Sequence, residues 1–124
     1  MIQKILAVAF GGSIGAVIRF LIFTYYDKLS NQNSHWATLA VNLLGSFLIG
    51  LLWGIFDRVY VSPGIRLFIF VGLLGSFTTF STFAFDVFSM SKSGDIKSLI
   101  IYILATNIFG VALAFGGYYL SKIS

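Results

Sequence analysis

Residues 72–86 read Gly-Leu-Leu-Gly-Ser-Phe-Thr-Thr-Phe-Ser-Thr-Phe-Ala-Phe-Asp and place small polar residues among phenylalanines inside an apolar segment. Glycine and β-branched threonine are weak helix formers, so we expect a helix through this stretch to break between Gly75 and Thr79. Inside a membrane, carbonyls freed by a break need protein, water or an ion as a partner, which makes the stretch a candidate binding or conduction site. The alternative is an unbroken helix that uses its small residues and hydroxyls for packing, and the stretch alone is compatible with both.

The composition is that of a membrane protein. Of the 124 residues, 58% are hydrophobic and 10% are charged, which is too apolar for an ordinary soluble fold. About 20 apolar residues span a bilayer, and four such runs are present: Ile5–Tyr26, Trp36–Phe56, Ile65–Phe88 and Leu99–Leu120. Because the connections are short, we expect residues 1–124 to form one all-α domain of four transmembrane helices, surrounded by lipid and without a soluble catalytic part.

Missing or misplaced residues exclude several classes of function. The chain has no cysteine, which removes thiolate metal ligands and redox chemistry. The eight basic residues are scattered singly, which argues against a nucleic-acid partner. The only histidine, His35, precedes Trp36 at a predicted membrane boundary, where an amphipathic ring is ordinary. An intramembrane hydrolase would need a base near Ser81 or Thr82, and His35 lies in the wrong place to serve them. We therefore expect no enzymatic activity.

Two polar side chains lie deep in the first two predicted helices. Arg19 is about 10 Å from the end of the first span at 1.5 Å per residue, and no carboxylate in that span neutralises it. We interpret Arg19 as a source of positive potential that attracts anions, with snorkelling to the interface as the alternative. Asn42 lies about 9 Å inside the second span on the same side of the membrane. Its amide is a donor for a desolvated anion, or else a link between helices.

Aromatic and hydroxyl side chains follow the expected break. Phe80 and Phe83 are three residues apart and share a helical face, with the hydroxyls of Ser81 and Thr82 beside them. A phenyl ring has a positive edge that attracts an anion lying in the ring plane, although two phenylalanines at this spacing also suit core packing. We interpret Asp86 as an interfacial carboxylate that marks the end of the third helix.

The last predicted helix carries a second set of hydroxyls. Tyr102 and Thr106 are four residues apart and therefore one turn from each other. They form either a hydroxyl track that faces the same space as Phe80 and Ser81, or a polar seam for packing.

The charge pattern gives almost no preference for one orientation in the membrane. The side with both termini carries Lys4, Arg58, Arg66 and Lys122, and the other side carries Lys28, Lys92 and Lys97. Orientation follows a lysine and arginine bias between short loops, so four against three allows insertion both ways. Gly11 with Gly15, and the ridge of Ser46, Gly50 and Gly54, permit close backbone approach. A bundle this small does not readily enclose a hydrated path, so we expect two copies to pack through these ridges as an antiparallel homodimer.

Taken together, these residues resemble the Fluc (CrcB) family of small fluoride channels over essentially the whole chain. The resemblance rests on three segments in the family's order and spacing: Gly11–Phe20, Thr38–Gly50 and Gly75–Phe83. It implies a dual-topology homodimer in the cell membrane with two pathways that let cytoplasmic fluoride leave the cell passively. It also implies a structural sodium ion at the dimer centre.

The resemblance suggests roles for individual residues. The fluoride pathway would involve Asn42, Phe80, Ser81, Thr82, Phe83, Tyr102 and Thr106. Arg19 matches the first-helix arginine of the family, and Gly75 and Thr78 match the broken third helix whose backbone carbonyls hold the sodium ion. Gly110 departs from the pattern, because it offers no hydroxyl one turn after Thr106.

The main alternative is a small dual-topology multidrug or cation antiporter with the same size and helix count. Such a protein would need an intramembrane carboxylate to exchange protons for a cation. The acidic residues are all predicted at or beyond helix ends: Asp27, Asp57, Asp86 and Asp95.

Fluoride is strongly hydrated, so its path needs amide, hydroxyl and ring-edge donors. The residues favour the fluoride channel. If the polar residues of the third helix serve packing alone, the sequence indicates a purely structural membrane protein.

Overall fold

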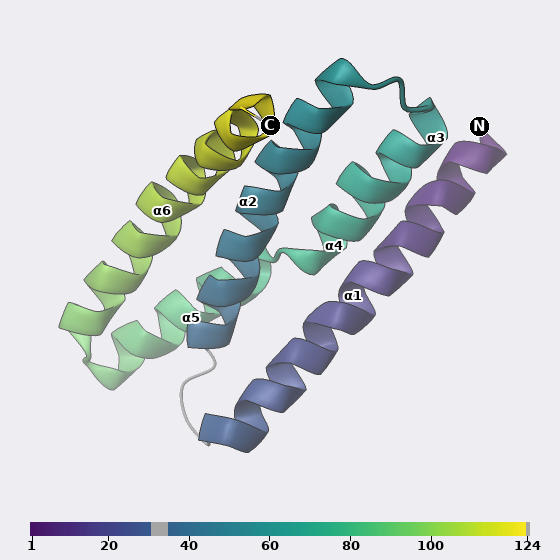
Figure 1. The fold of residues 1–124 in the computed structure, drawn as a ribbon. Helices are drawn as coiled ribbons and strands as arrows, with labels where there is room; N and C mark the ends of the chain where they lie inside the picture. Colours follow the sequence, from purple (N-terminus) through teal and green to yellow (C-terminus); the bar gives the residue numbers. More distant parts are fainter. Residues whose placement is uncertain (31–34, 124) are drawn as a thin grey trace.

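Four long apolar helical segments make up the chain in the computed structural model, which describes residues 1–30 and 35–123 (Figure 1). The first is α1, Ile2–Ser30, the second is α2, His35–Arg58, and the last is α6, Ile96–Ile123. The third segment, Pro63–Ser93, consists of several shorter helices. All four are long and apolar enough to cross a membrane, and the described residues contain no strand. The predicted all-α class and the four spans are confirmed.

Among the four described helical segments, the third is the irregular one. Its helices are α3 (Pro63–Arg66), the π-helical η1 (Leu67–Leu74), α4 (Gly75–Phe77) and α5 (Phe80–Ser93). Between α4 and α5, Thr78 (φ −79°, ψ 158°) and Thr79 (φ −150°, ψ 119°) have extended backbone. These two residues, called the link below, interrupt the helical ladder in the middle of the span.

Local sequence sets both ends of the third segment. Ser62 caps α3 by accepting a hydrogen bond from the Ile65 amide, and Pro63 occupies the first helical position, where its missing N–H costs nothing. At the other end, Gly94 has φ 84° and closes α5 in the left-handed conformation that favours glycine. Because this cap lies at Gly94, α5 continues past the predicted end at Phe88.

The helices pack in two pairs, α1 along η1 and α4, and α2 along α6. Glycines make both contacts close. A Cβ on Gly11 would overlap the carbonyl oxygen of Phe68 in η1, and a Cβ on Gly50 would overlap that of Ala114 in α6. The absence of a side chain at these positions lets the backbones touch.

This packing corrects one expectation about the small-residue ridges. Gly15 lies against Ser76, and Gly54 lies against Ser121, so these glycines face helices of the same chain, as Gly11 and Gly50 do. The prediction that the ridges join two copies of the chain is therefore wrong for Gly11, Gly15, Gly50 and Gly54. Spacing reveals that a close approach occurs but does not identify the partner helix.

The two termini lie at the same end of the bundle, as an even number of spans requires (Figure 1). Large apolar side chains are exposed along all four segments, for example Phe10, Trp53, Phe88 and Phe115. Lipid is the environment in which such a surface is stable.

Candidate functional site

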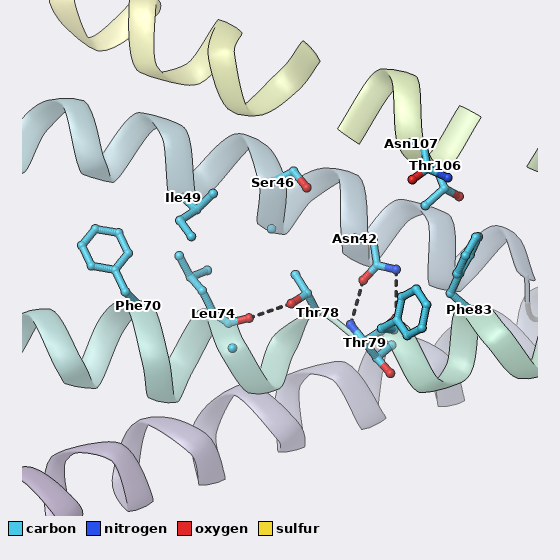
Figure 2. A pocket seen from close by; sticks show the side chains of 13 residues that line it. Asn42, Ser46, Ile49, Phe70, Leu74, Thr78, Thr79, Phe83, Thr106 and Asn107 are labelled. Atoms are coloured by element: carbon cyan, nitrogen blue, oxygen red, sulfur yellow. Dashed lines mark hydrogen bonds between the residues drawn. The ribbon is translucent and has the colours of Figure 1, made fainter. Parts of the chain in front are cut away.

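A groove with a cavity volume of about 340 Å³ lies between α2, the third segment and α6 (Figure 2). Its lining includes six of the site residues predicted from the sequence: Asn42, Gly75, Thr78, Phe80, Phe83 and Thr106. Ser46, Thr79 and Asn107 add further polar groups. None of the described lining residues is acidic or basic. The groove therefore presents amide, hydroxyl and aromatic groups without a full charge.

Asn42 of α2 joins the link by pairing with the backbone of Thr79 (Figure 2). Its Nδ2 donates to the Thr79 carbonyl at 3.0 Å, and its Oδ1 accepts from the Thr79 amide at 2.8 Å. The side chain thus satisfies both backbone groups of an extended residue, as a neighbouring β-strand would. An amide NH2 has two N–H groups, so one remains for the groove.

Thr79 also begins α5 with its side chain. Its Oγ1 accepts from the Thr82 amide at 3.2 Å and lies 3.2 Å from each of the hydroxyl oxygens of Ser81 and Thr82. Ser81 and Thr82, predicted as pathway residues, are bonded to this cap and do not line the groove. Sequence reasoning assigned Thr79 no role, although a threonine directly before a helical run is a recognisable N-cap signal.

The link also frees two backbone carbonyls at the groove. In a continuous helix the Thr79 amide would bond the Gly75 carbonyl, and the Thr82 amide would bond the Thr78 carbonyl. These two amides donate instead to Asn42 Oδ1 and to Thr79 Oγ1. Gly75 and Thr78 both line the groove, and in the described chain neither carbonyl receives its usual ladder amide.

Arg19 lies on the other side of the link, between α1 and α4. Its Nε donates to the carbonyl oxygen of Ser76 at 3.0 Å, and the side chain is half-buried. A cation at the carboxyl end of a helix is favourable, because the carbonyls there carry partial negative charge. Arg19 does not line the groove.

The aromatic side chains form a short chain from the groove toward α6. The ring centroids of Phe80 and Phe83 are 5.7 Å apart, and those of Phe83 and Tyr102 are 5.2 Å apart. Phe80 is 77% exposed although it lines the groove. This side of the groove is therefore open within a single chain.

Tyr102 and Asp86 form a buried pair next to these rings. The Tyr102 hydroxyl donates to Asp86 Oδ2 at 2.9 Å, and the two residues are 1% and 5% exposed. The prediction that Asp86 marks the end of the third helix is wrong, because α5 extends to Ser93 and Asp86 lies inside it. Tyr102 does not line the groove, and its proton is directed at Asp86.

Two neighbouring residues of α6 complete the groove. The Thr106 hydroxyl oxygen is buried and has no hydrogen-bond partner among the described residues. The Asn107 Nδ2 donates to the Ile103 carbonyl of its own helix at 2.8 Å, and the side chain is exposed. A buried hydroxyl without a partner costs free energy, so Thr106 is the strongest sign that the groove receives a polar ligand.

Comparison with known proteins gives this geometry a context. Residues 6–118 match the family described as CrcB-like protein, Camphor Resistance (CrcB). The chain belongs to the CrcB family. It is thus a multi-pass membrane protein of the cell membrane, as its four apolar helices indicate. The family resemblance predicted from the sequence is confirmed.

Several relatives in the CrcB family are named fluoride-specific ion channel FluC. The protein of Agrobacterium fabrum is 43% identical over 120 residues, which cover 96% of each chain. That of Leptospira interrogans is 38% identical over 121 residues, covering 97% of this chain and 95% of the relative. That of Aquifex aeolicus is 37% identical over 119 residues, covering 95% and 96%.

Proposed function

We propose that this CrcB family member is a passive fluoride channel and not an enzyme. The observation that carries the proposal is the buried Thr106 hydroxyl, which has no hydrogen-bond partner among the described residues and lies at a groove lined also by Asn42, Phe80 and Phe83. A desolvated fluoride ion needs donors in place of its water, and hydroxyl, amide and ring-edge groups supply them. A groove without a cationic side chain avoids trapping the ion. The names of the relatives support the same ion.

The working unit in this proposal is an antiparallel homodimer with two fluoride pathways. Phe80, Gly75 and Asn107 line the groove and yet are exposed in the single chain, so a second copy would complete its open side. The near balance of lysine and arginine between the two faces supports opposite insertion. Each pathway would then be lined by both subunits.

The proposal includes a structural sodium ion between the two copies. The link is the break in the third helix that supplies its ligands, namely the carbonyl oxygens of Gly75 and Thr78, whose ladder amides donate elsewhere. Rings of backbone carbonyls are established ligands for alkali cations. Among the described residues no cluster of His, Cys, Asp or Glu could hold a metal ion. Two antiparallel copies would offer four such carbonyls.

The remaining predicted residues have supporting roles in this proposal. Arg19 raises the local concentration of anions through its positive potential. Ser81 and Thr82 bond the Thr79 cap and so keep the link in place beside the ring edges. Tyr102 stands at the end of the aromatic chain, where its contact with Phe83 holds that ring toward the pathway.

Ion efflux from liposomes tests the proposal. Purified protein is reconstituted with potassium fluoride or potassium chloride inside, and efflux is started with a potassium ionophore. We expect fast fluoride efflux that depends on the ionophore, because passive anion movement needs a compensating charge, and little chloride efflux. No fluoride efflux from vesicles that contain folded protein would refute the function.

The antiporter alternative gains one observation, since Asp86 is a buried carboxylate inside a span. It does not line the groove, however, and its oxygen accepts the Tyr102 hydroxyl proton. An antiporter would exchange a cation on one side of the membrane for protons on the other, and it would leave fluoride inside the vesicles. Measuring internal pH in the same liposomes separates the two functions.

A further inference from the structure

The contact between α2 and α6 aligns the two helices in fixed register. They run side by side in the same direction (Figure 1). Gly50 lies against the Ala114 carbonyl, and one turn earlier a Cβ on Gly110 would lie 3.7 Å from the Ser46 hydroxyl oxygen. The helices therefore face each other at matched levels, and Ser46 stands opposite a residue that has no side chain.

Ser46 turns its side chain to the groove at this level. It lies one turn after Asn42 on α2, and both residues line the groove. A helical serine often bonds the carbonyl four residues earlier. Within residues 1–30 and 35–123, the Ser46 hydroxyl has no such bond and no other hydrogen-bond partner. Its proton is therefore free for a ligand in the groove.

Asn42, Ser46 and Thr106 thus place three donors at successive levels of the α2 and α6 walls. Thr106 stands one turn before Gly110, at the level of Asn42, and its buried hydroxyl also lacks a partner in the described chain. Asn42 keeps one N–H after pairing with Thr79. One helical turn separates the level of Asn42 and Thr106 from that of Ser46, a step of about 6 Å along the groove. Beyond Ser46, Gly50 and Ala114 bring the two backbones into contact and close this wall.

We propose that Ser46 is a fluoride-binding residue whose hydroxyl supplies, from α2, the donor that α6 lacks at Gly110. The inference rests on the proposed fluoride conduction and adds to it a residue that sequence reasoning had placed in a packing ridge. In a path from which water is excluded, the ion keeps contact with a donor at every step. Ser46 extends the donors one turn past Asn42 and Thr106.

The competing explanation is that Ser46 is present only because it is small. Alanine would then serve equally well, since it has nearly the same volume and no hydroxyl. The two explanations also differ about Gly110. If the hydroxyl matters, a serine at position 110 of the facing helix restores a donor to the same gap. If only size matters, serine at position 110 has no advantage over alanine.

The experiment compares fluoride efflux from liposomes for four variants and wild type. They are Ser46→Ala, Ser46→Ala with Gly110→Ser, Ser46→Ala with Gly110→Ala, and Ser13→Ala. The last is the matched control, because the Ser13 hydroxyl bonds the Ala9 carbonyl on an exposed part of α1. Efflux is normalised to folded protein, measured by gel filtration and thermal unfolding in detergent.

We expect Ser46→Ala to lower fluoride efflux about tenfold, the order expected for losing one hydrogen bond to a charged group. Gly110→Ser should recover most of that loss in the Ser46→Ala background, Gly110→Ala should not, and Ser13→Ala should match wild type. Unchanged efflux in Ser46→Ala overturns the inference, as does equal efflux with Gly110→Ser and Gly110→Ala. Absence of efflux in wild type refutes the proposed function itself, so the two failures are distinguishable.

Discussion

Asn42 combines a structural and a ligand-facing task in one side chain. Two of its polar atoms hold Thr79, and one N–H remains for the groove. The depth of Asn42 in its helix was predictable from the sequence. Its partner was not, because the bond joins residues 37 positions apart and depends on the extended backbone of the link.

The first prediction concerns the stability of the link. Asn42→Ala leaves the amide and carbonyl of Thr79 without partners, at a cost of about 1–3 kcal/mol for each buried group. We expect a clear fall in the unfolding temperature of the detergent-solubilised protein and loss of fluoride efflux. Asn107→Ala is the control for stability, since within the described residues that amide bonds its own helix alone. Equal unfolding temperatures for the two variants would contradict this assignment.

The second prediction concerns the ring edges of Phe80 and Phe83. Phe80→Leu and Phe83→Ile keep most of the volume, so each should cost less than about 1.5 kcal/mol in stability. Each should nevertheless lower fluoride efflux sharply, because an aliphatic side chain has no positive edge. Phe10→Leu, an exposed aromatic change on α1, is the control. Normal efflux in the double variant would leave Asn42 and the hydroxyls as the whole pathway.

At the scale of elements, apolar length was enough to predict four spans, and weak helix formers indicated where the third would be least regular. The third helical segment is longer than predicted, because α5 continues through the mostly polar stretch Ser89–Ser93 to the cap at Gly94. Hydropathy falls there while the helix persists. For this reason the prediction that Asp86 lies at the end of the third helix was wrong.

The third prediction tests the register of α2 and α6. Gly50→Ala would force a methyl group into the Ala114 carbonyl, whereas Gly12→Ala meets open space. Overpacking costs about 1–3 kcal/mol, so Gly50→Ala should lower the unfolding temperature and Gly12→Ala should not. If the two variants unfold alike, the two backbones are not in contact at Gly50.

At the scale of the whole molecule, the exposed groove residues and the balanced charge predict opposite insertion of two copies. The fourth prediction uses the absence of native cysteine. A single cysteine added after the carboxyl terminus should react only in part with an impermeant maleimide applied to intact cells, and a comparable remainder should react once the cells are permeabilised. The control is a membrane protein that inserts in one known orientation and carries a single cysteine after its own carboxyl terminus. Reaction from one face only would contradict dual topology.

The groove described above also bears on how the protein is made. Its walls come from α2, the third segment and α6, so residues early, midway and late in translation must all be present before it exists. A nascent chain that has inserted three spans lacks Thr106 and the helix that carries it. An incomplete chain is therefore not a leak in the membrane that receives it, and conduction begins only after synthesis is complete.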